Sequence, residues 1–350
     1  DFRLAVDRAN AALATREAER LQAQSKLTQQ ASLIAASDAQ VATTQATLGR
    51  SQIDLSRAET LRIATWNVNS IRTRVGRVTD WLTRSDVDVL AMQEIKCKPE
   101  QFPVQAFNDL GYQVTMHGLN QWNGVAFAHR IPAEEVEIGF TGMPGWGPDK
   151  TAEARAIGAT FDGVRLWSLY VPNGRELDDP HYHYKLEWLD RLAAIMADTI
   201  EHQPDLQLAL MGDFNIAPLD TDVWDIDYFA GATHVSEPER QAFEAFEQIG
   251  FSDLVRPLVA DGYTYWDYQQ LRFPKNEGMR IDFILGTETL AERVVKARID
   301  RDERKGEGPS DHVPVVVELV IGFNAIEVRA PLHVIERLVQ TALCRNVQRV

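Results

Sequence analysis

Several features that would place this chain in a special class of protein are absent from it. Only two cysteines, Cys97 and Cys344, occur in 350 residues, too few for a disulfide framework and without the spacing of a cysteine metal site. No run of about 18 apolar residues occurs, so the sequence predicts no transmembrane helix. The N-terminus lacks the order of basic, apolar and small residues that marks a signal peptide. A reducing, cytoplasmic setting is therefore expected.

Basic residues are in deficit. The 36 Lys and Arg against 51 Asp and Glu give a formal net charge of −15. A polyanionic partner normally leaves a basic footprint on a protein, so the overall charge argues against nucleic acid. Carboxylates gathered at a divalent-metal site would, however, make net charge a poor guide to phosphate binding. The 45% of hydrophobic and 25% of charged residues are otherwise ordinary for a globular protein.

Residues 1–60 differ in composition from the rest of the chain. They contain no proline and fourteen alanines, whereas all eight tryptophans lie between Trp66 and Trp266. Apolar side chains follow a seven-residue register that is broken at Arg20, and they are Val6, Leu13, Leu27, Ile34, Val41 and Leu48. Such a thin seam is typical of a coiled coil or helical hairpin. We expect residues 1–58 to form an N-terminal α-helical, coiled-coil extension that is either inert or self-associating.

From residue 61 onward, short apolar runs alternate with helical periodicity. The runs predict strands at 61–66, 87–92, 124–128, 206–211, 281–285 and 313–319. Two further runs, 156–161 and 164–171, flank Asp162-Gly163 and predict a hairpin with a two-residue turn. Helices are predicted at 71–84, 182–200 and 238–249, and residues 321–350 read as an amphipathic helical tail. This mixture favours mixed sheets covered by helices.

Acids and amides follow several of the predicted strands. They are Asn67 and Asn69, Glu94, Asp213 and Asn215, Asp282, and Asp311 with His312. In layered α/β folds ligands gather where strand ends and their loops meet. Oxygen donors of this kind suit Mg²⁺, which usually takes one or two carboxylates. The sequence therefore predicts a hard-cation site.

Taken singly, these residues carry little information. A glutamate after a strand, such as Glu94, is usually solvated, and an Asp-Phe-Asn sequence can serve as a turn or helix cap. Asp282 is harder to dismiss because it lies within an apolar run, where a charged group needs a partner. His312 would supply that partner and would be oriented by it.

The order of the motifs along the chain resembles the exonuclease III family of abasic-site endonucleases, within the larger endonuclease/exonuclease/phosphatase superfamily. The matching stretches are TWNVNSIR (65–72), MQEIK (92–96), WNGVAF (122–127), LYVPNG (169–174), GDFN (212–215), THVSEPER (233–240), YTYWDYQ (263–269), KNEGMRIDFIL (275–285) and GPSDHVPV (308–315). The resemblance implies an α/β (α+β) fold, a four-layer sandwich of two mixed β-sheets flanked by helices. It assigns residues 59–320 to the catalytic domain, between the extension and the tail at 321–350.

The same resemblance implies the catalytic and metal-binding residues. Asp213 and Asn215 would activate the attacking water and hold the phosphate, Tyr170 would contact the phosphate side, and Asp282 and His312 would form a carboxylate–imidazole pair. Either Asp213 or His312 could be the base. Glu94 would be the main ligand of a Mg²⁺ ion, which Mn²⁺ can replace, with Asn67 and Asp311 beside it.

The implied substrate is double-stranded DNA with abasic sites or blocked 3′ ends. Hydrolysis would occur 5′ of the abasic site, with 3′→5′ exonuclease and 3′-phosphatase activity beside it. Asn173 would contact the phosphate, and Tyr265, Trp266 and Met279 would form the apolar wall that receives the abasic sugar. Arg72, Lys275 and Arg280, each in a basic cluster beside a motif, favour a basic rim on an acidic body. The catalytic domain is expected to be a monomer with no membrane partner.

Two other functions fit parts of the sequence. A phosphodiesterase or phosphatase acting on lipid or small-molecule phosphates would share the superfamily fold, but THVSEPER, YTYWDYQ and KNEGMRIDF favour the DNA-repair branch. A coiled-coil assembly protein with a passive nuclease domain would be expected to lack a catalytic residue, and none is missing. The segment 46–59 is also similar to the coiled-coil hairpin of periplasmic efflux adaptors.

Overall fold

The computed structural model describes residues 60–321 and scattered helical positions between 13 and 45. The chain divides into two compact units, Asp1–Glu59 and Thr60–Val350. In the first unit Leu13, Leu27, Ile34 and Val41 of the predicted seam are 51–66% exposed. The other seam positions and the predicted C-terminal helix lie outside the described residues. Within the described part of the chain, no helix is both long and apolar enough to cross a membrane.

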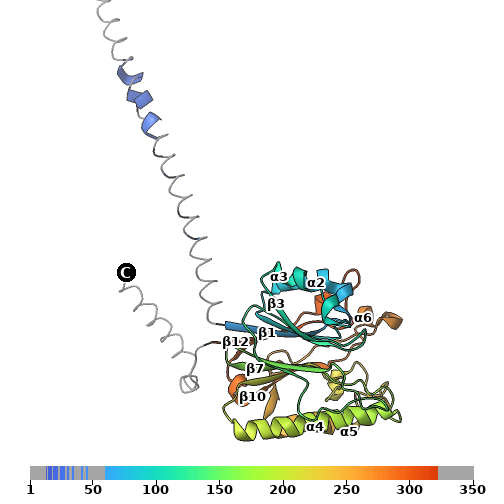
Figure 1. Ribbon diagram of the computed structural model, residues 1–350. Coiled ribbons are helices and arrows are strands. Elements are labelled where there is room, and N and C mark those ends of the chain that lie inside the picture. Colours follow the sequence, from blue (N-terminus) through green and yellow to red (C-terminus); the bar gives the residue numbers. More distant parts are fainter. Residues whose placement is uncertain are drawn as a thin grey trace, which may run out of the picture. The chain divides into compact units, whose positions relative to one another are not determined.

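Two six-stranded mixed sheets form the framework of the second unit (Figure 1). The first sheet has the order β11-β12-β1-β2-β4-β3, with β1 Thr60–Asn67, β2 Val89–Gln93, β3 Gln113–His117, β4 Val125–His129, β11 Val294–Ile299 and β12 Val315–Val320. The second has the order β5-β6-β7-β8-β10-β9, with β5 Glu134–Ile138, β6 Ala156–Phe161, β7 Val164–Tyr170, β8 Leu208–Asp213, β9 Phe251–Asp253 and β10 Asp282–Thr287. In each sheet the central pair, β1–β2 or β7–β8, is parallel.

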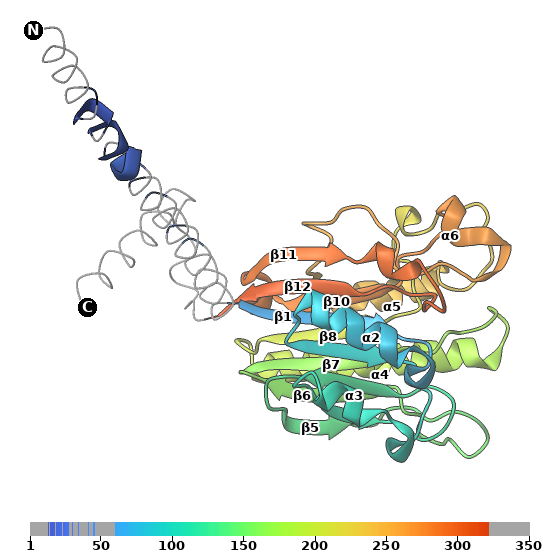
Figure 2. The ribbon, with the colours of Figure 1, turned by 90° about the horizontal axis from the view of Figure 1, so that it is seen from above.

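Helices cover the outer face of each sheet, which makes four layers (Figures 1 and 2). Helices α2 (Ile71–Ser85) and α3 (Val104–Asn108) pack on the first sheet through a cluster that includes Trp66 and Trp81. Helices α4 (Pro180–His202) and α5 (Glu237–Gln248) pack on the second. The short helices α6 (Arg272–Lys275) and α7 (Glu288–Ala291) lie in connections. The predicted four-layer sandwich is confirmed.

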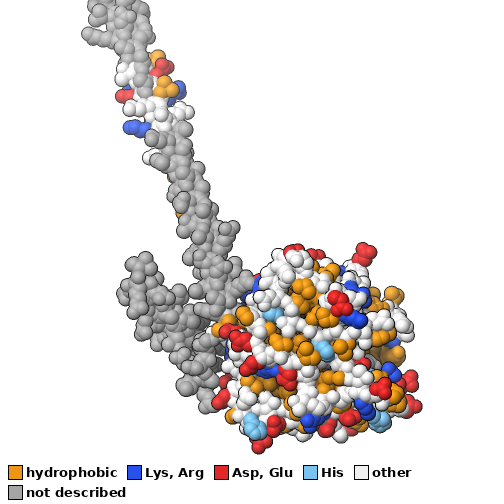
Figure 3. All heavy atoms as spheres, in the orientation of Figure 1, with side chains coloured by type: hydrophobic (Ala, Val, Ile, Leu, Met, Phe, Trp, Pro, Cys, Tyr) orange, Lys and Arg blue, Asp and Glu red, His pale blue; other side chains and the backbone are white. Residues whose placement is uncertain are grey.

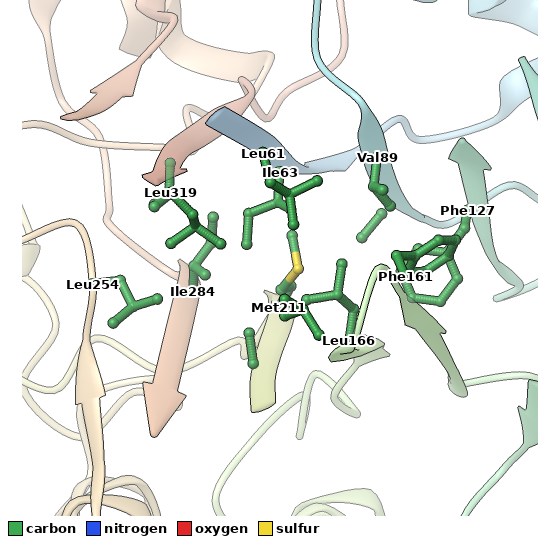
Figure 4. Close-up of a cluster of buried hydrophobic side chains, with 14 of the residues drawn as sticks. Leu61, Ile63, Val89, Phe127, Phe161, Leu166, Met211, Leu254, Ile284 and Leu319 are labelled. Atoms are coloured by element: carbon green, nitrogen blue, oxygen red, sulfur yellow. The ribbon is translucent and has the colours of Figure 1, made fainter. Parts of the chain in front are cut away.

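The two sheets face each other across a continuous apolar core (Figure 4). Leu61, Ile63 and Val89 of the first sheet lie over Leu166 and Met211 of the second, and all of them are fully buried. Burying each such side chain stabilises the fold by about 1.5–3 kcal/mol. The core therefore fixes one sheet against the other. Side chains at the strand ends are consequently held in fixed relative positions.

The predicted interior strands are present, with ends that differ by at most two residues from the sequence-based ranges. The hairpin β6–β7 is confirmed as well. Its turn residues Asp162 and Gly163 have φ of 49° and 77°, the left-handed pair that a type I′ turn requires. The sequence did not predict β3, β5, β9 and β11, which are the four edge strands of the two sheets.

Candidate active site

The predicted site residues converge because the central strands of each sheet end at the same edge. In the first sheet Asn67 at the end of β1 lies beside Gln93 at the end of β2, directly before Glu94. In the second, Tyr170 at the end of β7 pairs with Asp213 at the end of β8. Asp282, the first residue of β10, is the antiparallel partner of Asp213. Parallel pairing of β1 with β2 and of β7 with β8, and antiparallel pairing of β8 with β10, thus bring side chains from distant motifs together.

Asn67 joins the two sheets at this edge. Its side chain is fully buried, and Nδ2 donates to Glu94 Oε1 and to Asp213 Oδ2, each at 2.9 Å. A buried amide without partners would cost free energy, so both carboxylates are needed here. The amide consequently holds a carboxylate of each sheet at a fixed separation.

Glu94, Asp213 and His312 each offer a ligand atom, and these atoms lie within 4.8 Å of one another. Glu94 and Asp213 supply carboxylate oxygens to this group, and oxygen donors fit a hard divalent cation. The ammonium of Lys96 lies 2.6 Å from Glu94 Oε2, so the carboxylate already attracts positive charge. Asp311, the other predicted ligand, is not among these three residues, and its Oδ1 accepts from Asn69 Nδ2 at 3.1 Å.

Charge and burial compete at Glu94. Burial works to raise the pKa of this carboxyl, but the Lys96 ammonium and the hydrogen bonds from Lys96 and Asn67 outweigh it and hold the pKa below its ordinary value. Glu94 itself adopts a left-handed backbone with φ of 51°, a conformation that costs energy for a residue other than glycine. The group is therefore held ionised by its neighbours, as a metal ligand must be.

His312 lies between two carboxylates. Its Nδ1 is 2.8 Å from Asp282 Oδ2, and its Nε2 is 3.7 Å from Asp213 Oδ2. Burial lowers the pKa of the imidazole, but Asp282 and Asp213 outweigh that effect and raise it to about 10. Burial also raises the pKa of Asp213 to about 7, with Asp282 adding to it and His312 opposing it. The predicted Asp282–His312 pair is present in this structure, with the imidazole charged.

A second group of side chains surrounds Asn215, which follows β8 in a left-handed conformation with φ of 51°. Asn173 Nδ2 donates to Asn215 Oδ1 at 3.0 Å, and His234 Nε2 lies 3.3 Å from the same oxygen. Asn215 Nδ2 donates to the Val171 carbonyl at 3.0 Å. The sequence indicated Asn173 and Asn215, but His234 was missed because no spacing or charge pattern distinguishes it within its motif.

Tyr170 is held over the site by Arg155, a residue that the sequence analysis also missed. The guanidinium of the buried Arg155 lies 4.9 Å from the Tyr170 ring centroid. Burial and the neighbouring Glu94, to which the hydroxyl is hydrogen-bonded, raise the pKa of Tyr170 well above its ordinary value. Tyr170 consequently remains a neutral phenol that can donate a hydrogen bond.

Two residues of the predicted apolar wall lie together beside His312, and the third lies behind them. Tyr265 pairs with Met279 through the backbone, and its ring centroid is 4.9 Å from that of His312. A cavity of about 420 Å³ opens next to Met279 and His234. Trp266 has no exposed surface, so it supports the wall from within rather than forming its surface. Its ring packs edge-on against Phe273.

Of the three predicted rim cations, two lie at the surface. Arg72 is exposed, and the side chain of Lys275 is 52% exposed. Arg280 is only 2% exposed, and it donates to Asp253 at 3.1 Å and to the Val259 carbonyl at 3.0 Å. Arg280 therefore forms a buried ion pair with Asp253 and is not part of the predicted basic rim. On the face seen in Figure 3, acidic and basic side chains are interspersed.

Many known proteins are similar to this chain in sequence or in fold. Exodeoxyribonuclease III of Haemophilus influenzae is 29% identical over 273 residues, covering 74% of this chain and 99% of its own. A 3′ phosphatase (NExo) from Neisseria, solved with a product DNA hairpin, is 34% identical with a TM-score of 0.70, covering 74% of this chain and 99% of its own. An AP endonuclease from Archaeoglobus fulgidus is 36% identical with a TM-score of 0.68, covering 73% and 98%.

A family model extends these pairwise similarities to the whole catalytic region. The model of the Endonuclease/Exonuclease/phosphatase family matches residues 64–312. It therefore spans the strand ends that carry Asn67 and Glu94 as well as His312 at the last motif. The match begins after the segment 46–59, whose similarity to efflux adaptors gains no support. By fold, by motif order and by this match, the chain belongs to the Endonuclease/Exonuclease/phosphatase family.

Proposed function

We propose that the protein is a metal-dependent DNA repair nuclease that hydrolyses the phosphodiester 5′ of abasic sites. Exonuclease action in the 3′→5′ direction and 3′-phosphatase action would use the same site. The observation that carries this proposal is the convergence of Glu94, Asp213 and His312 at the joint edge of the two sheets. The similar proteins are named as an exodeoxyribonuclease III, an AP endonuclease and a 3′ phosphatase.

The resident cofactor is proposed to be Mg²⁺, held by Glu94 with Asn67 and Asp213 beside it, and Mn²⁺ can substitute for it. The oxygen-rich donor set supports a hard cation of this kind. When bound, such an ion neutralises negative charge that accumulates on the phosphoryl and leaving oxygens. Asn67 would contribute by holding the carboxylates of Glu94 and Asp213 close to each other.

Asp213 is proposed as the group that accepts the proton of the attacking water. Its pKa of about 7 suits a general base at neutral pH. His312, charged because of Asp282, would donate from Nε2 to a phosphoryl oxygen, and the neutral hydroxyl of Tyr170 would donate beside it. These donors are fixed before the substrate arrives, so stabilising the transition state requires little reorganisation. The phosphate would lie between Asn215 and His312.

Selectivity for an abasic nucleotide is proposed to come from the cavity beside Met279. An abasic nucleotide has no base to unstack, so moving it out of the duplex costs less than moving a normal nucleotide. The cavity is lined by Phe229 and Met279 together with polar and charged side chains that include Arg175, Glu176 and Thr233, a mixture that suits the ring and the hydroxyls of a deoxyribose. This arrangement would select the lesion without reading sequence.

Cleavage of a duplex with a single abasic-site analogue tests the proposal. Incision 5′ to the lesion in Mg²⁺, and none in EDTA, is the expected result. Incision that persists in EDTA would contradict the metal assignment. A protein that leaves abasic DNA intact yet releases phosphate from lipid or small-molecule esters would support the non-DNA phosphodiesterase and rule out the repair function.

Replacing Glu94 with Ala is expected to raise the Mg²⁺ concentration needed for half-maximal incision, because the main carboxylate ligand is lost. A titration of incision rate against Mg²⁺ measures the shift. The matched control is Glu318→Ala, which removes a partly buried carboxylate on β12 that pairs with Lys296 and lies outside the group of candidate ligands. An unchanged Mg²⁺ requirement in the Glu94 variant would exclude it as a ligand.

DNA affinity is expected to fall with salt despite the net charge of −15. The slope of log affinity against log salt should be about −0.9 per phosphate contacted. Lys275→Ala should make the slope shallower by about 1, whereas Lys296→Ala should not change it. Lys296 is 74% exposed but pairs with Glu318 on β12, remote from the site. Titrations of labelled duplex at several salt concentrations measure both slopes. A DNA affinity that does not change with salt would contradict the predicted basic rim.

A further inference from the structure

A buried ion pair lies directly behind the active-site loops. Lys185 on α4 and Glu239 on α5 form it, and both side chains have no exposed surface. Burying two charges costs several kcal/mol per ion, so an apolar pair of similar volume would often be as stable or more stable. A contribution to folding stability therefore does not explain why the two charges are buried here.

Lys185 contacts the two loops that carry the phosphate-side amides. Its ammonium donates to the backbone carbonyl of Asn215 at 2.6 Å and to that of Asn173 at 3.3 Å. The carbonyl of Asn215 belongs to a residue in the costly left-handed conformation. The lysine therefore stabilises the strained backbone that aims the Asn215 side chain.

Glu239 fixes the third loop. It accepts from the hydroxyl of Thr233 at 2.7 Å and from that of Ser236 at 2.6 Å. His234 lies between these two residues, with φ of 78°, and its Nε2 faces Asn215 Oδ1. The loops are pressed together as well, because a Cβ at Gly174 would approach Thr233 Oγ1 to 2.8 Å and Lys185 Cδ to 3.2 Å.

We propose that the Lys185–Glu239 pair is a positioning device that holds Asn173, Asn215 and His234 in the geometry needed to grip the scissile phosphate. None of the three residues lies in a strand or helix. Their side-chain positions must therefore be set by contacts such as those that Lys185 and Glu239 make. Neither Lys185 nor Glu239 touches the substrate. The inference rests on the proposed function, since it concerns the same phosphate site.

The test compares single and double variants. Lys185→Met alone is expected to lower both the melting temperature and kcat, because Glu239 is left buried and unpaired. Lys185→Met with Glu239→Gln removes both charges and should recover most of the melting temperature. Its kcat should stay low by about 100-fold, the effect of a misplacement of about 1 Å in an active site. A purely structural pair would recover activity together with stability, so full kcat in the stable double variant would overturn the proposal.

A matched control and a milder variant complete the design. Arg256→Met with Asp222→Asn removes another largely buried pair and should leave kcat unchanged. Thr233→Val removes one hydroxyl without touching a charge and should lower kcat by about 3–10-fold, as expected for one hydrogen bond. If the double variant does not fold, an unchanged kcat in Thr233→Val overturns the proposal.

The activity of the unsubstituted protein shows whether the proposed function or the positioning role has failed. All variants are measured on abasic duplex and on bis(p-nitrophenyl) phosphate. A parent that cleaves only the small diester contradicts the repair function, while the variants still test the positioning role on that diester. A parent that cleaves abasic DNA, with variants of unchanged kcat, contradicts the positioning role alone.

Discussion

Asp213→Asn is expected to lower kcat for abasic-site incision by about 10²–10⁴-fold, the contribution typical of a positioned general base. The amide keeps an oxygen that can accept from the backbone N–H of Asn215, which Asp213 Oδ1 binds at 2.9 Å. The loop is therefore expected to stay in place while the proton acceptor is lost. Single-turnover kinetics with saturating enzyme measure the effect on the chemical step.

The same substitution is expected to make the stability of the metal-free protein less dependent on pH between about 4 and 7. The folded-state pKa of Asp213, about 7, lies above its ordinary value of 3.8, so the ionised carboxylate destabilises the fold as pH rises through 7. Asparagine carries no such charge. Thermal unfolding in EDTA at pH 5 and at pH 8 measures this difference. Asp222→Asn, at another buried carboxylate whose pKa is raised, is the control and should retain kcat. Equal losses of kcat in both variants would contradict the role of Asp213.

Phe214→Ala is expected to reduce the free energy of unfolding by about 3–5 kcal/mol, as is usual for a buried phenylalanine. Phe214 is fully buried, and its ring packs edge-on against Phe243, Phe246 and Phe283. It also lies between Asp213 and Asn215 in sequence, so its packing fixes the backbone of both. Activity should fall as well as stability. Denaturant unfolding and kcat, measured on the same preparation, test the two effects.

Phe107→Ala provides the comparison for this variant. Phe107 is fully buried on α3 in the cluster that packs on the first sheet, away from the strand ends that carry the site. A similar loss of stability with unchanged kcat is expected below the unfolding transition. If the two variants lost kcat equally, the packing of Phe214 would have no special connection to the site.

The interior of the fold could be predicted from sequence, whereas its edges could not. Strands such as β2 and β8 are covered on both faces, so their sequences are nearly continuous apolar runs. The edge strand β5 is exposed at every position and contains three glutamates. Charged edge strands discourage pairing with other molecules. Because such strands contain few apolar residues, hydrophobic periodicity does not predict them.

Some side chains of the site could likewise be predicted from sequence, whereas others could not. The order of the motifs indicated Asn67, Glu94, Asp213 and His312, because each of them lies in a loop or at a strand end beside a predicted interior strand. No local pattern distinguishes a rim arginine from a buried one. Arg280 lies among basic residues in sequence, yet Asp253 and the Val259 carbonyl hold it in the interior. Contacts between residues far apart in the chain decided that outcome.

The sequence by itself determined the interior strands, the main helices and the chemical types that meet at the site, because periodicity and strand ends are local properties. Tertiary structure decided which of those residues are exposed and what holds them. Trp266 lies behind the wall, and Lys185 and Glu239 meet although they are 54 residues apart. Burial and ion pairing depend on packing between α4, α5 and the loops of the second sheet, and that packing exists only once the layers have assembled.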